Sequence, residues 1–209
     1  MNGIFQLDSP LWRFLNTCTD VILLSLLWIV TSLPLITLGP ALIALYEQMY
    51  LISENHEGHI ISGYWKSFQK ACKEWLVVFL AGILLGLVLV GDWYILIVGK
   101  MPYGAFLLPV VVVLSITYLV VFLYVVALGA TCEAPKKQIF LLALTMPVKE
   151  WLRTLFMLFI VIIMGMVGVL VYAPFLAVAP GVIALSHIYL FREIFKKYHM
   201  QVVEEHVEF

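Results

Sequence analysis

Two ionisable residues stand at matching places in two similar stretches of an otherwise apolar sequence. Glu47 follows the second proline of PLITLGPALIAL (34–45) by seven residues, and His187 follows the second proline of PFLAVAPGVIAL (174–185) by the same interval. A carboxylate beside an imidazole can relay protons or hold substrate hydroxyl groups. Ionisable groups inside membrane segments are costly and mark functional positions. We therefore treat Glu47 and His187 as a candidate intramembrane polar pair; the alternative is that both lie hydrated and unpaired near helix ends.

Other residues capable of chemistry do not form a recognisable set. The histidines of HEGH (56–59) are three residues apart, whereas an HExxH zinc site needs them four apart on one helical face. The three cysteines, Cys18, Cys72 and Cys132, are an odd number without metal-ligand spacing, which argues against a metal cluster or a disulfide framework. We therefore expect no catalytic, metal-binding or cofactor-binding residues, and predict that the chain is not an enzyme.

Composition indicates the environment of the fold. Hydrophobic residues make up 64% of the 209 residues and charged residues only 12%, and the mean hydropathy is +1.06. A soluble domain carries roughly twice that share of charged residues. The net charge of −1 and the absence of a large basic patch exclude a nucleic-acid-binding protein. The lipid bilayer is the solvent that fits this chain.

Six apolar stretches predict an all-α membrane protein, a six-span bundle of three hairpins in a single domain of residues 1–209. The spans are expected at about 21–38, 40–53, 75–98, 103–128, 151–173 and 180–191, followed by a charged tail, 192–209. The segments 1–20, 54–74, 129–153 and the tail hold all 12 Lys and Arg residues except Lys100. Because basic residues mark the cytoplasmic side, both termini are expected there, in a plasma membrane.

Four prolines mark the corners of the first and third hairpins. Pro34 and Pro40 match Pro174 and Pro180 at an offset of 140 residues, and the triplet IAL follows in both copies. Two interpretations stay open, an internal duplication of the hairpin and coincidence. The span after the first corner is short for a bilayer, so either this helix runs on into Glu54 or the corner is partly re-entrant.

Two further patterns predict surfaces. An amphipathic basic segment, 60–74, is expected to lie as a helix on the membrane, where it would bind anionic lipid or a partner. The candidate docking face consists of Trp65, Lys66, Phe68, Lys70, Lys73, Trp75 and Glu133. Gly82 and Gly86 form a GxxxG motif, which predicts close helix packing within the chain or, alternatively, a homo-oligomer.

The sequence resembles a known family in several places. The runs LDSPLWRFLN (7–16) and VILLSLLWIVTSLPLITLGPALIALY (21–46) resemble the start of the YesL family, multi-pass membrane proteins of Gram-positive bacteria with a domain of unknown function. FQKACKEW (68–75) is also similar, whereas ATCE (130–133) departs from the family's Ala-Arg-Phe-Glu. The resemblance implies an accessory role in carbohydrate transport, because such genes often neighbour those of carbohydrate ABC transporters.

Two classes of function therefore stay open. The first is a non-enzymatic accessory or interaction protein, with the permease subunits of a carbohydrate ABC importer as the partner that the resemblance implies. The alternative is a small transporter or channel for a polar solute. A transporter needs a polar pathway, for which the chain offers Glu47, His187, Ser25, Thr31, Thr37 and Ser186.

Overall fold

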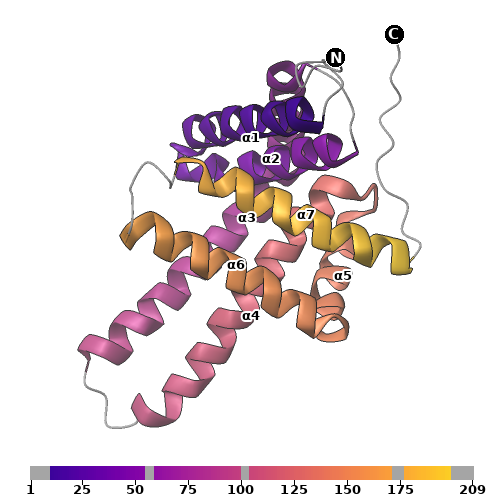
Figure 1. Ribbon diagram of the computed structural model, residues 1–209. Coiled ribbons are helices and arrows are strands. Elements are labelled where there is room, and N and C mark those ends of the chain that lie inside the picture. Colours follow the sequence, from indigo (N-terminus) through magenta and orange to yellow (C-terminus); the bar gives the residue numbers. More distant parts are fainter. Residues whose placement is uncertain (1–9, 55–58, 100–103, 171–176, 199–209) are drawn as a thin grey trace, which may run out of the picture.

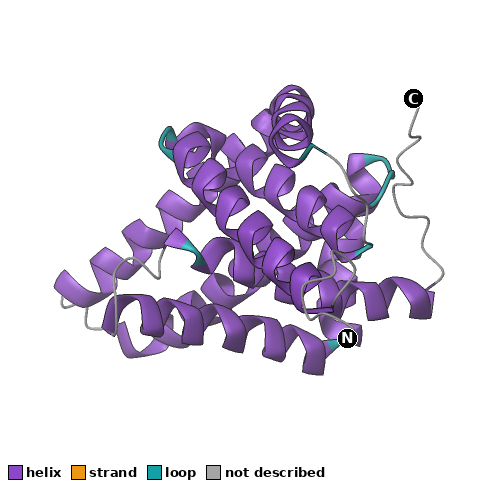
Figure 2. Cartoon of the chain, turned by 45° about the horizontal axis from the view of Figure 1, so that its top comes forward, coloured by secondary structure: helices purple, strands orange, loops and turns teal. Residues whose placement is uncertain are grey.

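The computed structural model describes residues 10–54, 59–99, 104–170 and 177–198, and this part of the chain is helical without a β-strand (Figure 2). The all-α prediction is therefore confirmed. The elements are α1 (Pro10–Ser32), the 3₁₀ turn η1 (Leu35–Thr37), α2 (Leu38–Ser53), α3 (Ile60–Val98), α4 (Gly104–Thr131), α5 (Lys136–Lys149), α6 (Trp151–Leu170) and α7 (Ala179–Tyr198).

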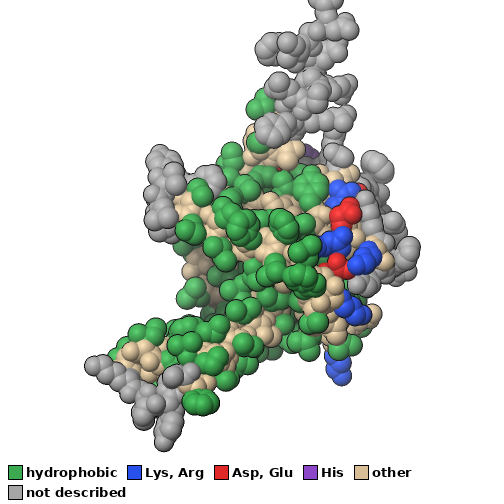
Figure 3. All heavy atoms as spheres, turned by 60° about the horizontal axis from the view of Figure 1, so that its bottom comes forward, with side chains coloured by type: hydrophobic (Ala, Val, Ile, Leu, Met, Phe, Trp, Pro, Cys, Tyr) green, Lys and Arg blue, Asp and Glu red, His purple; other side chains and the backbone are tan. Residues whose placement is uncertain are grey.

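Several of these helices can cross a membrane. Five candidate spans occur among the described residues, at Leu15–Ser32, Leu35–Ser53, Ile60–Val98, Phe106–Thr131 and Trp151–Gly168. Apolar side chains cover most of the face in Figure 3, while charged side chains gather along one side. The chain is thus a multi-helix membrane protein. Helix α7 is not among the five candidates, because its second half carries charged residues such as Arg192 and Glu193.

Helix α2 occupies the centre of the helix packing. It packs against α1, α3, α4 and α7, and α7 also packs against α1 and α6. Small residues permit this close packing, since Gly39, Ala41 and Ala44 of α2 are all buried. Helices α3 and α4 run side by side and extend away from the other helices as a long hairpin at the lower left of Figure 1. The hairpin thus exposes apolar side chains over much of its surface, whereas most residues of α2 are buried.

The basic segment 60–74 is not a separate surface helix, so this prediction is wrong. It forms the first part of α3, which continues unbroken for 39 residues, about 58 Å at 1.5 Å per residue. Its inner face, with Tyr64, Ser67 and Ala71 buried, packs on α2 rather than on lipid. The Gln48 side-chain amide of α2 donates a hydrogen bond to Ser67 Oγ at 3.1 Å. An amphipathic helix must bury its apolar face, and a neighbouring helix can cover that face as well as a bilayer can.

The first proline corner is built by local hydrogen bonds. Helix α1 ends at Ser32, and the carbonyl oxygen of Pro34 accepts a bond from Thr37 N at 2.9 Å, closing η1. The Thr37 hydroxyl also donates to Thr31 O at 2.6 Å. Pro40 is the third residue of α2, where its missing N–H would have had no partner inside the helix. Helix α2 therefore begins at Leu38, two residues earlier than predicted.

The second corner is described only in part. Pro180 is the second residue of α7, again within the first turn of a helix. Pro174 lies outside the described residues. The hydroxyl of Ser25 in α1 accepts a hydrogen bond from Gly181 N at 3.1 Å, and a Cβ at Gly181 would lie 2.8 Å from Val21 O. The first turn of α7 is thus pressed directly against the backbone of α1.

Candidate functional site

His187 is held by two partners inside the bundle, and neither is Glu47. The side chain is fully buried, at 0% exposure. Its Nε2 lies 3.1 Å from the carbonyl oxygen of Met157 in α6, and its Nδ1 lies 2.7 Å from the Tyr46 hydroxyl in α2. Because a carbonyl only accepts, Nε2 carries the hydrogen and the Tyr46 hydroxyl donates to Nδ1. The predicted Glu47–His187 pair is therefore wrong, and the imidazole instead joins α2, α6 and α7.

Glu47 points to a different place, a polar cleft of about 520 Å³ enclosed by α2, α3, the end of α4 and the start of α5. Three carboxylates and two ammonium groups line this cleft: Glu47, Glu74, Glu133, Lys70 and Lys136. Apolar and small residues complete the lining, with Ile43, Ala71, Trp75, Gly129, Ala130, Cys132, Ala134, Pro135 and Ile139. The cleft thus gathers five ionisable groups in a chain where such groups are scarce, which makes it the candidate functional site.

Trp75 provides the cleft with a fixed aromatic face. The side chain is only 5% exposed and packs near Phe79, with ring centroids 6.4 Å apart. Gly129 of α4 allows this approach, since a Cβ there would lie 3.1 Å from the indole. The ammonium of Lys136 stands 5.8 Å from the centroid of the indole ring and donates to the carbonyl oxygen of Glu74. A lysine of α5 thus makes a cation–π contact inside the cleft.

The predicted docking face divides between this cleft and the outer side of α3. Lys70 and Glu133 line the cleft, as does Trp75. The Trp75 side chain is buried in the core and contributes to this face only as part of the cleft wall. Trp65, at 51% exposure, Lys66 and Lys73 are exposed on α3 outside the cleft, and Phe68 is half-buried.

Sequence reasoning missed Glu74, Lys136 and Cys132 as members of the site. The sequence indicated two of them only by position, since Glu74 directly precedes Trp75 and Cys132 directly precedes Glu133 in the predicted docking face. No group of three or more His, Cys, Asp or Glu side chains able to hold a metal occurs among the described residues. Of the HEGH motif, residues 56–58 lie outside the described part.

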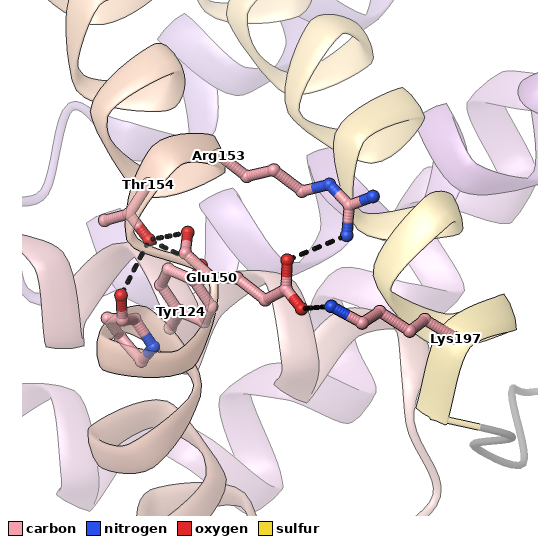
Figure 4. Close-up of polar contacts among 6 residues, drawn as sticks. Tyr124, Glu150, Arg153, Thr154 and Lys197 are labelled. Atoms are coloured by element: carbon pink, nitrogen blue, oxygen red, sulfur yellow. Dashed lines mark hydrogen bonds and ion pairs between the residues drawn. The ribbon is translucent and has the colours of Figure 1, made fainter.

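A second polar cluster joins the ends of α5, α6 and α7 (Figure 4). Glu150, between α5 and α6, is 8% exposed and accepts a hydrogen bond from Arg153 Nη1 at 3.0 Å and another from Lys197 Nζ of α7. Beside it, the Thr154 hydroxyl contacts Glu150 O at 3.1 Å and the Tyr124 hydroxyl of α4 at 2.8 Å. The charged end of α7 is thus joined to the packed structure through Lys197.

Arg192 fastens the middle of α7 to the end of α2. One guanidinium nitrogen, Nη1, donates to Ser53 O at 2.8 Å, and Nη2 lies 2.9 Å from Glu54 Oε1. Ser53 is the last residue of α2, so its carbonyl has no partner within the helix. Arg192 therefore caps α2 with both a hydrogen bond and a positive charge.

Replacing Arg192 by alanine should lower the free energy of unfolding by about 1–2 kcal/mol, the size expected for a charge-assisted hydrogen bond to a helix end. Thermal unfolding in mild detergent measures this loss. Arg192→Lys is the matched control, because it keeps the charge but cannot contact Ser53 O and Glu54 through two nitrogens at once. Equal stability of wild type and Arg192→Ala would show that the cap contributes nothing.

The two glycines of the GxxxG motif have different surroundings. A Cβ at Gly86 would lie 2.9 Å from the Tyr118 hydroxyl of α4, which donates to the carbonyl oxygen of Gly82 at 3.0 Å. Gly82 itself has no heavy atom within 4 Å of where a Cβ would be. The motif thus permits close packing of α3 and α4 within the chain, at Gly86. A homo-oligomer through Gly82 stays a prediction.

Comparison with known proteins adds one match. A family model described as "Protein of unknown function, DUF624" matches residues 21–98. The matched region runs from α1 through α2 and α3, which contribute Glu47, Lys70, Glu74 and Trp75 to the cleft. No curated protein and no solved structure matches the chain. The match to a domain of unknown function agrees with the resemblance inferred from the sequence, and it assigns no activity.

Proposed function

We propose that the protein is a non-enzymatic accessory protein of the plasma membrane and that it binds a partner protein at the polar cleft. The supporting observation is the cleft, where five ionisable side chains from α2, α3, α5 and the loop before α5 surround a buried tryptophan. Charged and aromatic groups around a concave surface are typical of recognition sites. The partner suggested by the family resemblance is a permease subunit of a carbohydrate ABC importer.

The proposed topology has six spans in three hairpins with both termini in the cytoplasm, α7 forming the sixth span. In this topology the cleft opens to the cytoplasm, because Lys70, Glu133 and Lys136 lie in segments assigned to that side by their basic residues. Exposed Lys66 and Lys73 would then face the anionic leaflet and hold this end against the membrane.

The alternative, a transporter for a polar solute, has less support in the bundle. The hydroxyl groups proposed for its pathway bond to carbonyl oxygens nearby, Ser25 to Val21 at 2.7 Å and Ser186 to Val182 at 2.7 Å. Both nitrogens of His187 are also engaged. These groups are satisfied within the protein, whereas a conducting pathway needs polar groups that can bind a solute.

Affinity purification in mild detergent tests the proposed function. We expect importer permease subunits to co-purify with the wild-type chain and to be lost with the charge reversals Lys70→Glu and Glu133→Lys. Lys149→Glu is the matched control, because Lys149 is exposed in α5 but does not line the cleft. Recovery of no importer subunit, or equal recovery with all three variants, would contradict the proposal.

A further inference from the structure

The cleft contains a cation-binding position that one of its own lysines fills. The ammonium of Lys136 stands over the face of Trp75 and donates to the carbonyl oxygen of Glu74. An aromatic face and a carbonyl oxygen together are a recognised setting for an ammonium or guanidinium group. Both are fixed in place, since Trp75 is part of the core and the Glu74 carbonyl belongs to α3.

The charges around this position also favour a cation. Glu47, Glu74 and Glu133 line the cleft against Lys70 and Lys136, which leaves one negative charge in excess. When the Lys136 side chain swings out, the excess becomes two negative charges beside the exposed indole face. Carboxylates near a partly desolvated site attract cations more strongly than they do in water.

The Lys136 side chain can leave its place over Trp75 because its backbone lies at the edge of the cleft. It is the first residue of α5, its side chain is exposed, and its described contacts in the cleft are those with Trp75 and Glu74. A lysine has a flexible four-carbon stem and loses little when its ammonium returns to water. The position over Trp75 can therefore change occupant without any change in the helices.

We infer that the cleft binds a lysine or arginine side chain of the partner protein over Trp75, and that Lys136 occupies this position until the partner displaces it. This inference rests on the proposed function and identifies the chemistry of the partner. Lys136 then acts as a competitor built into the site, so that removing it strengthens binding, whereas removing a residue that contacts the partner would weaken it.

Cys132 is a reporter of occupancy, because it lines the same cleft. Burial raises the pKa of its thiol, an effect that the neighbouring Thr131 hydroxyl partly offsets, so less thiolate is present at a given pH and alkylation is slow. Labelling is therefore measured at one mildly alkaline pH in a Cys18→Ala, Cys72→Ala background. A ligand over Trp75 should then slow the reaction of Cys132 with a maleimide.

The experiment compares Lys136→Ala with Lys137→Ala, a neighbouring exposed lysine that does not line the cleft. The probes are a short peptide amide with one central lysine and the same peptide with that lysine acetylated. With Lys136→Ala, the cationic peptide should protect Cys132 at about two- to five-fold lower concentration than with Lys137→Ala or the unsubstituted background, the size of one exposed cation–π contact. Lys136→Arg should restore the higher concentration, because arginine refills the position.

Three results would overturn the inference: equal protection in the Lys136→Ala and Lys137→Ala proteins, equal protection by the acetylated peptide, or no protection of Cys132 by the cationic peptide. Failure of the proposed function is distinguishable from these. If importer subunits co-purify but the peptide never protects Cys132, the cation site is wrong and the proposed function stands. If the peptide protects as expected but no importer subunit co-purifies, the cation site stands and the proposed partner is wrong.

Discussion

Gly39→Ala should destabilise the protein by about 1–3 kcal/mol, although it adds a single methyl group. Gly39 lies in the first turn of α2 directly beneath the ring of Phe79 in α3, and a Cβ there would overlap the ring carbons. Phe79 cannot easily move, because it is buried and packs edge-on against Phe122 with ring centroids 5.5 Å apart. The thermal-unfolding midpoint in detergent measures the effect.

Gly82→Ala is the matched control for this substitution. Gly82 is also a helical glycine, but no heavy atom lies within 4 Å of its missing Cβ. Alanine at position 82 should be neutral or slightly stabilising, because alanine favours the helix over glycine. Phe79→Leu should relieve part of the clash, so that the double variant Gly39→Ala, Phe79→Leu is more stable than the sum of the single losses predicts. Similar losses for Gly39→Ala and Gly82→Ala would contradict the packing of α2 beneath α3.

His187→Leu should cost about 1–3 kcal/mol, because it leaves the buried Tyr46 hydroxyl without its acceptor. The two side chains lie 2.7 Å apart, from Tyr46 OH to His187 Nδ1, and both are buried. Tyr46→Phe should also destabilise, since it leaves Nδ1 without a donor. The double variant should lose less than the sum of the two single losses, because both polar partners are then removed together.

Glu47→Gln is the control for this cycle, because the sequence analysis predicted Glu47 as the partner of His187. Its effect should add to that of His187→Leu without coupling, because both imidazole nitrogens are bound elsewhere. Coupling of position 187 to position 47 instead of position 46 would show that the hydrogen bonds of the buried histidine are wrongly assigned. Unfolding in mild detergent reports all of these variants on one scale.

The histidine shows how far the sequence could lead. Hydropathy and the shared proline spacing gave contact between His187 and α2 as one of two alternatives, and His187 does contact α2, through Tyr46. They could not choose between Tyr46 and Glu47, because consecutive residues point about 100° apart around a helix and the rotation of α2 is set by its neighbours. Buried Gly39 lets Phe79 of α3 approach closely, and in this packing Tyr46 is buried while Glu47 lines the cleft.

Helix α3 shows a different limit of sequence-based prediction. Its amphipathic first part has the pattern of a surface helix, and the sequence placed it on the membrane, where it would bind anionic lipid or a partner. The same pattern fits a protein partner, and Tyr64 is buried with its hydroxyl 2.6 Å from Thr31 Oγ1 of α1. The proline corner was easier to predict, because the ring of proline and its missing N–H interrupt a helix whatever its neighbours are. The cleft joins residues from 43 to 139 of the chain, and no local sequence pattern reports such distant contacts.

In-cell photo-crosslinking from the cleft tests most directly whether this membrane protein binds a partner there. A photoreactive amino acid is placed at Lys70 or Glu133, on two sides of the cleft, or at Lys149, which is exposed but outside it. We predict that positions 70 and 133 give the same adduct, containing an importer permease subunit, and that position 149 does not. No adduct from either cleft position, or one adduct formed equally from all three, would contradict the proposed binding site.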